Sequence, residues 1–315
     1  MKNISIGKFR ALQRCTSLRG TLTCLALDHR QNLRKINPLF EDGAQLSHFK
    51  MDVVKYVASS GTAVLLDPEV AASQAIASGI LPGDRGLVVS LEATGYVGSS
   101  DAREVTILPG WSVEKAKRMG ADMVKLLVYY HPDSSMAAEI EEKTARIGEE
   151  CTKYDLGLML EPLSYSLSSE KLTSDEKRRV VIETARRLTR IPGVDILKAE
   201  FPLDPSEQDP DKVRSACRGL NAATTIPWII LSAAVGYDTY LQQVMICCEE
   251  GASGAAAGRA IWKEAILMSA EERVKFLQTT ARERLSRLNA LCFSLARPIQ
   301  DWYRADAPLD WYKTY

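Results

Sequence analysis

Histidine is scarce in this sequence, and neither sign of charge is in excess. The 315 residues include three histidines, and forty basic side chains balance forty acidic ones. A protein without net charge has no general electrostatic attraction to nucleic acid or to an anionic membrane surface. We therefore expect no nucleic-acid partner and no membrane partner, and a small molecule is the expected ligand.

Long apolar runs and paired cysteines are also absent. No segment reaches the roughly 18 consecutive apolar residues of a membrane-spanning helix, and the first residues, MKNISIGKFRALQRC, lack the apolar core of a signal peptide. The seven cysteines show no CxxC spacing of the kind found in zinc or redox sites. We interpret them as the reduced thiols of a cytoplasmic protein.

Short apolar runs that alternate with longer amphipathic stretches are abundant. Eight runs have the length of buried strands, at residues 21–29, 63–70, 86–93, 122–130, 157–165, 195–203, 227–235 and 251–260. Apolar residues recur at helical spacing in segments 43–60, 111–120, 136–154, 173–190 and 238–251. Eight such units predict an α/β protein with a (β/α)8 TIM barrel rather than an open, doubly wound sheet. Residues 265–303 predict extra C-terminal helices, and no break in composition divides residues 1–315 into separate domains.

The run DILKAEFPL places Lys198 among apolar neighbours. Lysine is among the residues least often fully buried, because an ammonium group in an apolar interior needs a partner or loses its proton. Either the strand ends near Lys198 and the side chain reaches water, or the protein uses the amine.

Other polar residues also come late in the apolar runs. In a TIM barrel the active site lies at the carboxyl ends of the strands, where these residues would meet. Lys125, Glu161, Lys198 and Ser232 are spaced by 34 to 37 residues, which is one βα unit each. The full set consists of Asp28, His29, Arg30, Glu92, Lys125, Glu161, Lys198, Glu200, Ser232 and Arg259.

Lysines and carboxylates at one barrel mouth predict Schiff-base chemistry. A lysine amine attacks a carbonyl only when it is unprotonated, and burial together with a neighbouring cation such as Lys125 would lower the pKa of Lys198. A carboxylate opposite the amine, such as Glu161, could then carry the protons of imine formation and carbon–carbon cleavage.

The segment AAAGRA predicts a phosphate site. Small residues let a ligand approach the backbone, and Arg259 beside Gly258 can bind phosphate oxygens with two N–H groups. Ser232 on the preceding strand adds a hydroxyl, and phosphate sites after the last two strands recur in such barrels. The alternative is that Arg259 forms a surface ion pair at the end of the barrel.

Seven segments resemble, in order and in approximate spacing from residue 20 to 265, the class I tagatose 1,6-bisphosphate aldolases. They are LALDHRQNLR, VVSLEATGY, WSVEKAKRMGADMVKLLVYYHPD, MLEPLSY, DILKAEFPLD, PWIILSAAV and GASGAAAGRAIW. The resemblance implies reversible cleavage of a ketohexose 1,6-bisphosphate into dihydroxyacetone phosphate and glyceraldehyde 3-phosphate, with no metal or other cofactor.

The resemblance also implies a role for each matched residue. Lys198 would form the Schiff base, and Glu161 would be the proton shuttle. Asp28 and Lys125 would contact the substrate or relay protons. The residues expected to bind phosphate are Ser232, Gly258 and Arg259.

Two residues depart from the family pattern. His29 stands where we expect glutamine, and Pro162 follows the glutamate as in the related sulfofructose phosphate aldolases, which share LEP, ILS and AGRA.W with this chain. The sequence therefore leaves open whether the aldehyde product carries phosphate or sulfonate, and which ketohexose epimer is preferred.

Two alternatives come from other classes of protein. His29 and His131 with acidic neighbours suggest a divalent metal, but HxH or HExxH spacing is absent and His48 lies within a helical pattern. A non-catalytic sugar-phosphate-binding barrel would keep the phosphate site, yet it would have no use for a buried Lys198 and Glu161.

Two segments have no assigned role. Residues 97–110 lie in a stretch expected to form a loop over the site. The aromatic C-terminus, ARPIQDWYRADAPLDWYKTY, could pack over the barrel or at the contact of a homo-oligomer.

Overall fold

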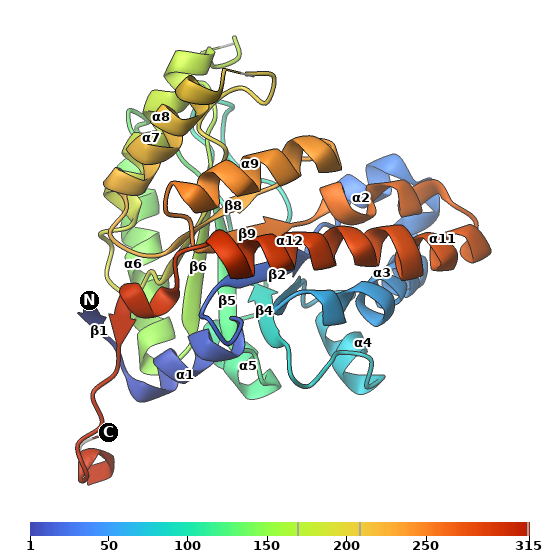
Figure 1. Cartoon of the computed structure of the whole chain (residues 1–315), viewed down its shortest axis with the longest axis horizontal. Coiled ribbons are helices and arrows are strands. Elements are labelled where there is room, and N and C mark those ends of the chain that lie inside the picture. The colour runs from blue at the N-terminus through green and yellow to red at the C-terminus, as the bar shows by residue number, and fades with distance from the viewer. Residues whose placement is uncertain (169, 208, 314) are drawn as a thin grey trace.

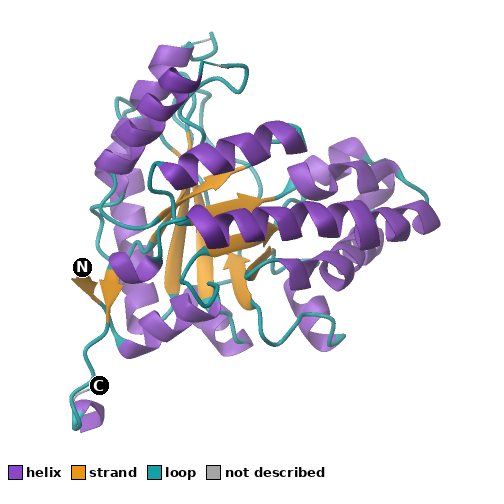
Figure 2. Ribbon diagram, in the orientation of Figure 1, coloured by secondary structure: helices purple, strands orange, loops and turns teal. Residues whose placement is uncertain are grey.

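The computed structural model describes residues 1–168, 170–207, 209–313 and 315. Within these residues, eight parallel strands close into a barrel in sequence order, and helices surround it (Figures 1 and 2). The strands are β2 Leu22–Ala26, β3 Ala63–Leu66, β4 Gly86–Ser90, β5 Met123–Tyr129, β6 Gly157–Leu163, β7 Ile196–Ala199, β8 Trp228–Leu231 and β9 Gly254–Ala257. The predicted TIM barrel is confirmed, and each strand lies inside its predicted run.

The helices alternate with the strands along the chain. They are α1 Ile6–Arg14, α2 Gln31–Ile36, α3 Gly43–Val57, α4 Ala72–Ala77, α5 Val113–Met119, α6 Ala137–Lys153, α7 Ser174–Leu188, α8 Pro210–Ala223, α9 Tyr237–Glu249, α10 Arg259–Trp262, α11 Ala270–Phe276 and α12 Arg282–Leu295. The five predicted helices are confirmed as α3, α5, α6, α7 and α9. Within the described ranges, none of the helices has both the length and the apolar character needed to cross a bilayer.

Local sequence signals set where the helices begin and end. Thr173 starts α7 with a capping box to Glu176, and Gly120 ends α5 in the left-handed conformation that glycine tolerates best. Helix α8 was not among the predicted helices. Its start carries a clear signal, because the side chain of Asp209 caps it and Pro210 occupies its first turn.

The C-terminal helices complete the outer ring of the barrel. Helix α10, which follows the last barrel strand, has a single turn, and α12 packs instead against α9, β2 and β9 (Figure 1). The helix α12 therefore covers the joint where β9 pairs with β2. The extra C-terminal helices expected from the sequence are part of the barrel wall.

The amino end of the barrel is closed by protein. Helix α1 lies against it, and the ammonium of Lys8 binds the carboxylate of Asp195 at 3.0 Å. The hydroxyl of Tyr303 donates to the carbonyl of Asp195, where β10 Tyr303–Arg304 pairs with β1 Lys2–Asn3. The aromatic C-terminal segment thus packs at the end opposite to the carboxyl ends of the strands.

The small residues of β9 are required by the close approach of β2. Gly254 has φ +147°, and a Cβ atom there would lie 1.7 Å from the carbonyl oxygen of Leu22. We expect Gly254→Ala to lower the free energy of unfolding by about 3 kcal/mol or more, because the strand must shift and adopt a strained backbone. Urea unfolding of the purified protein measures this effect.

Gly83→Ala is the matched control, because nothing lies within 4 Å of the added methyl group. Its free energy of unfolding should change by less than about 0.5 kcal/mol. Equal stability of the Gly254→Ala protein and the wild type would contradict the proposed packing of β9.

Candidate active site

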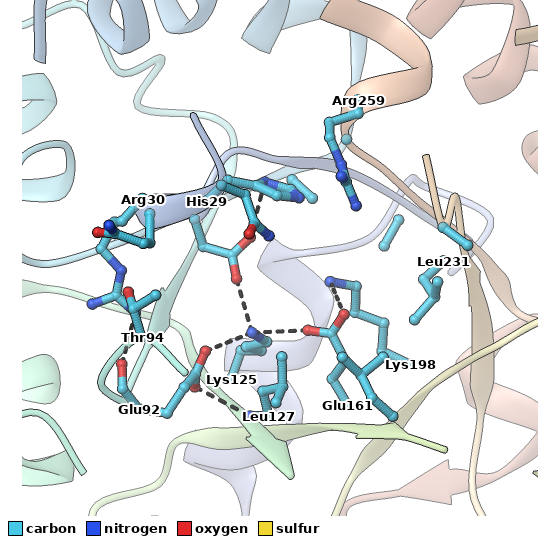
Figure 3. Close-up of a pocket in the computed structure, with 18 of the residues that line it drawn as sticks. His29, Arg30, Glu92, Thr94, Lys125, Leu127, Glu161, Lys198, Leu231 and Arg259 are labelled. Carbon is cyan, nitrogen blue, oxygen red and sulfur yellow. Dashed lines mark hydrogen bonds and ion pairs between the residues drawn. The ribbon is translucent and has the colours of Figure 1, made fainter. Parts of the chain in front are cut away.

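A cavity of about 600 Å³ opens at the carboxyl ends of the barrel strands. All seven site residues expected from the sequence line it, and so do the four other residues of the strand-end set, His29, Arg30, Glu92 and Glu200. Figure 3 shows the charged side chains pointing toward one another across the mouth. The seven expected residues are Asp28, Lys125, Glu161, Lys198, Ser232, Gly258 and Arg259.

Lys125 lies at the centre of this charged cluster. It is 1% exposed, and its Nζ lies 2.8 Å from Asp28 Oδ2, 2.6 Å from Glu92 Oε1 and 2.8 Å from Glu161 Oε2. Burial alone would lower the pKa of Lys125, but the three carboxylates hold this pKa well above its ordinary value. Lys125 is therefore a permanent cation that binds carboxylates from three strand ends.

Glu161 lies between the two lysines. Its Oε1 is 3.0 Å from Lys198 Nζ, and its Oε2 binds Lys125. Burial opposes ionisation of Glu161, yet Lys125 and then Lys198 outweigh it and lower the pKa of this carboxyl. Glu161 is thus ionised near neutral pH, and its Oε1 is placed to accept a proton from Lys198.

Asp28 is held in the same way from the other side of Lys125. Burial favours its neutral form, but the nearby cations Lys125 and Lys198 hold the pKa of Asp28 well below its ordinary value. Together with Glu161, it places a second fixed negative charge near Lys198.

The position of Lys198 decides whether its side chain reaches water or lies inside the barrel. Its side chain is buried at 4% exposure and points into the cavity, so the alternative that it reaches water is wrong (Figure 3). The sequence expectation also made Lys125 a cation beside Lys198. The structure instead places Glu161 between the two ammonium groups, so a carboxylate is the immediate partner of both.

The expected phosphate site lies at the ends of β8 and β9. The guanidinium of Arg259 points into the cavity, and among the described residues it has no carboxylate or carbonyl partner (Figure 3). The alternative that Arg259 forms a surface ion pair is therefore wrong. Burial lowers the pKa of Arg259, although Asp28 and Glu161 oppose this effect. A bound anion would supply the missing partner.

Gly258 and Ser232 complete this side of the cavity. The backbone nitrogen of Gly258 donates to Ser232 Oγ at 3.4 Å, and both residues line the cavity together with Arg259. A Cβ atom at Gly258 would lie 3.1 Å from the ring of His29 and 3.2 Å from the carbonyl of Ala26. A side chain at position 258 would therefore crowd the ring of His29 and the backbone of β2.

His29 is a neutral side chain of the cavity wall. Its ring packs edge-on against Trp262, and its Nδ1 has no hydrogen-bond partner in the described part of the chain. Burial lowers the pKa of His29 to about 4, with the carboxylate of Asp28 opposing and the cation Arg259 adding to the shift.

The histidines do not assemble a metal site. Nδ1 of His131 accepts a hydrogen bond from the backbone of Asp133, and His48 is exposed on α3. In the chain as described, histidine, cysteine and acidic residues form no group of three that could hold a metal ion.

Two supporting residues, Lys50 and Asp67, escaped the sequence analysis, whereas Arg30 was in the strand-end set without an assigned role. Arg30 binds Glu69 and donates to the carbonyl of Glu92, which fixes the end of β4. Lys50 on α3 forms a fully buried ion pair with Asp67, just after β3. The strand-end position of Asp67 was a visible signal, but a helical lysine such as Lys50 looks like any solvated residue.

Comparison with known proteins identifies the family. The model of the DeoC/LacD family of aldolases matches residues 22–264. This chain belongs to that family. Relatives include tagatose 1,6-diphosphate aldolase 1 of Enterococcus faecalis, 30% identical over 92% of this chain and 95% of the relative. The tagatose 1,6-diphosphate aldolase of Lactococcus lactis is also 30% identical, over 93% of this chain and 98% of the relative.

Solved structures of aldolases share the fold. An archaeal fructose 1,6-bisphosphate aldolase superposes with a TM-score of 0.61 at 22% identity, covering 91% of this chain and 99% of its own. A Schiff base-forming fructose-1,6-bisphosphate aldolase gives 0.59 at 24% identity, covering 88% and 99%. The family resemblance seen in the sequence is confirmed, and the chain is an aldolase, a carbon–carbon lyase.

The neutral state of His29 makes the stability of this aldolase sensitive to acid. An unfolded histidine titrates near pH 6.5, whereas the pKa of His29 in the fold is about 4. The unfolded chain therefore binds the proton first as pH falls, and stability is lost between these values. Of the stability lost from pH 7 to pH 5, we expect His29 to account for about 2 kcal/mol, and His29→Gln should remove this share.

Urea unfolding at the two pH values tests this prediction. His48→Gln is the control, because that histidine is exposed, and it should retain the full acid sensitivity. If His29→Gln loses as much stability as the wild type on acidification, His29 is not held neutral.

Proposed function

We propose that this aldolase is a class I enzyme that cleaves tagatose 1,6-bisphosphate into dihydroxyacetone phosphate and glyceraldehyde 3-phosphate through an imine on Lys198. The observation that carries the proposal is the carboxylate of Glu161 bound between two buried lysines, both of which line the cavity. Arg259 lines the same cavity and has no carboxylate partner among the described residues. The names of the tagatose 1,6-diphosphate aldolases among its relatives support this choice of substrate.

Substrate binding would begin with the C1 phosphate. Arg259 offers two N–H groups, and Ser232 and the backbone of Gly258 add further donors. Anchoring the phosphate at the ends of β8 and β9 brings the C2 carbonyl toward Lys198 on β7, the neighbouring strand.

Imine formation requires proton transfers that Glu161 is placed to make. Lys198 must lose a proton before its nitrogen attacks C2, and the ionised Glu161 at 3.0 Å is the acceptor. The protonated Glu161 then gives a proton to the carbinolamine hydroxyl, which leaves as water and yields the iminium. The surrounding carboxylates of Asp28, Glu92 and Glu161 stabilise this cation.

Cleavage needs a base for the C4 hydroxyl. Glu161, returned to its ionised form, removes that proton while the C3–C4 bond breaks and its electron pair moves into the iminium. The products of this step are the free aldehyde and an enamine on Lys198. Protonation of the enamine at C3 and hydrolysis of the imine then release dihydroxyacetone phosphate. Every step uses residues of this chain and no metal.

A second substrate is favoured by one sequence feature. Pro162 follows Glu161 as in sulfofructose phosphate aldolases, whose aldehyde product carries a sulfonate. Both substrates give dihydroxyacetone phosphate, so the chemistry at Lys198 is the same. Relative kcat/KM for tagatose 1,6-bisphosphate, fructose 1,6-bisphosphate and the sulfonated ketose phosphate decides between them.

Borohydride reduction in the presence of dihydroxyacetone phosphate tests the imine. We expect a reduced adduct on Lys198 in peptide mass spectra, with and without a chelator. Lys198→Ala should abolish both adduct and turnover while inorganic phosphate still binds through Arg259. An adduct on another lysine, or activity lost to the chelator, would overturn the proposal.

The role of Arg259 is tested by steady-state kinetics. Arg259→Ala should raise the KM for the bisphosphate about 10- to 100-fold, because a charge-assisted contact to phosphate is lost. Arg304→Ala, a change at the amino end of the barrel, is the control and should leave KM unchanged. If Arg259→Ala also leaves KM unchanged, the C1 phosphate binds elsewhere.

A further inference from the structure

The segment between β4 and α5 forms a hairpin beside the mouth of the barrel. Backbone bridges pair Glu92 with Ile107 and Val97 with Glu104, and Thr94, Gly95 and Tyr96 line the active-site cavity. The expected loop over the site is therefore an ordered hairpin, residues 92–107, and its inner side faces the substrate.

Arg103 in this hairpin is enclosed by aromatic rings. Its guanidinium carbon lies 4.7 Å from the ring centre of Tyr96, 5.5 Å from that of Tyr129 and 4.8 Å from that of Tyr165. Cation–π contacts stabilise the charge from the faces of the rings, but they leave the N–H groups at the edge of the guanidinium unsatisfied.

Few of these N–H groups have a partner. Nε of Arg103 donates to the carbonyl of Ser100 at 2.9 Å, and within the described residues neither terminal nitrogen meets a carboxylate or carbonyl. The hydroxyls of Tyr96 and Tyr129 likewise have no hydrogen bond in that part of the chain, although both tyrosines line the active-site cavity. Several donors therefore converge without an acceptor.

Arg103 opens onto a second cavity of about 530 Å³. Lys171 and Lys177 also line it, opposed by the carboxylates of Glu170 and Glu200, so its charged side chains sum to an excess of positive charge. Glu200 lines both cavities. At about 3.3 Å per residue, Glu200 lies about 7 Å beyond Lys198 toward the mouth. The second cavity thus adjoins the space where a substrate bound to Lys198 would extend.

We propose that Arg103, with the hydroxyls of Tyr96 and Tyr129, binds the oxyanion at the far end of the substrate, the phosphate or sulfonate that leaves with the aldehyde. This inference rests on the proposed function, because it takes the substrate to be bound at C2 by Lys198. We call these three residues the distal anion site. Lys171 and Lys177 add positive potential on its outer side.

A purely structural role for Arg103 is the competing explanation. The hairpin already has other anchors, since Lys143 binds Glu104 and also donates to the carbonyl of Val105 at 3.1 Å. On the other side, the hydroxyl of Tyr165 donates to the carbonyl of Asp101 at 3.3 Å. These contacts hold the hairpin on α6 and β6 without the terminal nitrogens of Arg103.

The test measures KM in the condensation direction for three aldehydes, of which two carry a terminal anion and one is uncharged. Dihydroxyacetone phosphate is held constant, and KM is measured for glyceraldehyde 3-phosphate, for sulfolactaldehyde and for uncharged glyceraldehyde. For Arg103→Gln we expect KM for the preferred anionic aldehyde to rise about 10- to 100-fold, with KM for glyceraldehyde changed less than about twofold. Arg103→Lys should restore part of the loss, because it keeps the charge.

Lys143→Gln is the matched control, because it removes contacts that anchor the same hairpin through Glu104 and Val105 and not through Arg103. It should leave the ratio of KM for the preferred anionic aldehyde to KM for glyceraldehyde as in the wild type. If Lys143→Gln changes this ratio as much as Arg103→Gln, or if Arg103→Gln raises KM equally for charged and uncharged aldehydes, Arg103 is structural and the distal anion site is wrong. The wild-type preference between the two anionic aldehydes identifies phosphate or sulfonate as the bound group.

Borohydride trapping of dihydroxyacetone phosphate on Lys198 separates this inference from the proposed function. An adduct in Arg103→Gln at the wild-type level, together with the selective loss for the anionic aldehyde, supports both. Absence of the adduct in the wild type defeats the proposed function. An adduct without any selective loss defeats the distal anion site alone.

Discussion

The two ion pairs that hold Glu161 between Lys125 and Lys198 are the interaction on which the rest of the site depends. Lys125, Lys198, Glu92 and Glu161 are buried at one barrel mouth, where Asp28 is 10% exposed, and each charge would be costly to bury without the others. They come from the ends of β2, β4, β5, β6 and β7, so the cluster assembles only when the barrel closes. The fold and the chemistry are therefore coupled, because the strand register that closes the barrel also sets the distances around Lys125.

The surrounding structure holds the strand ends that carry these charges. Arg30 joins the end of β2 to the end of β4, and the buried pair of Lys50 and Asp67 fixes the segment between them. At the amino end of the barrel, Lys8 and Asp195 form another buried ion pair, directly before the first residue of β7. Buried charges removed from their partners are strongly destabilising, so these pairs penalise any shift of register that would misalign the site.

The sequence predicted the features that repeat and missed those that occur once. Spacings of one βα unit placed Lys125, Glu161, Lys198 and Ser232 at one mouth, where the structure has them. Asp28 came from its strand-end position, and Gly258 and Arg259 came from the segment AAAGRA. The predicted strands were too long because each apolar run continues past the last paired residue of its strand into the loop that follows. Lys50 was missed because a lysine in a helix gives no sign of its partner, and that partner, Asp67, is joined to it only by the fold. The ordered hairpin around Arg103 was read as a loop, since its pairing involves isolated bridges and no long alternation.

Anchoring a ketohexose at its two charged ends would fix its position along the cavity without deciding its stereochemistry. Epimers at C4 carry the same anions at the same two ends, so under both proposals Arg259 and Arg103 would contribute equally to binding either epimer. Discrimination has to arise where the C4 hydroxyl meets its base, and the freedom of Glu161 to follow that hydroxyl is limited by Lys125 and Lys198. A rigidly held base disfavours the epimer whose hydroxyl points away, whereas a base that can tilt accepts both. How strongly the Lys125 ion pairs restrict movement of Glu161, more than either anion site, would therefore set the selectivity of this aldolase between C4 epimers.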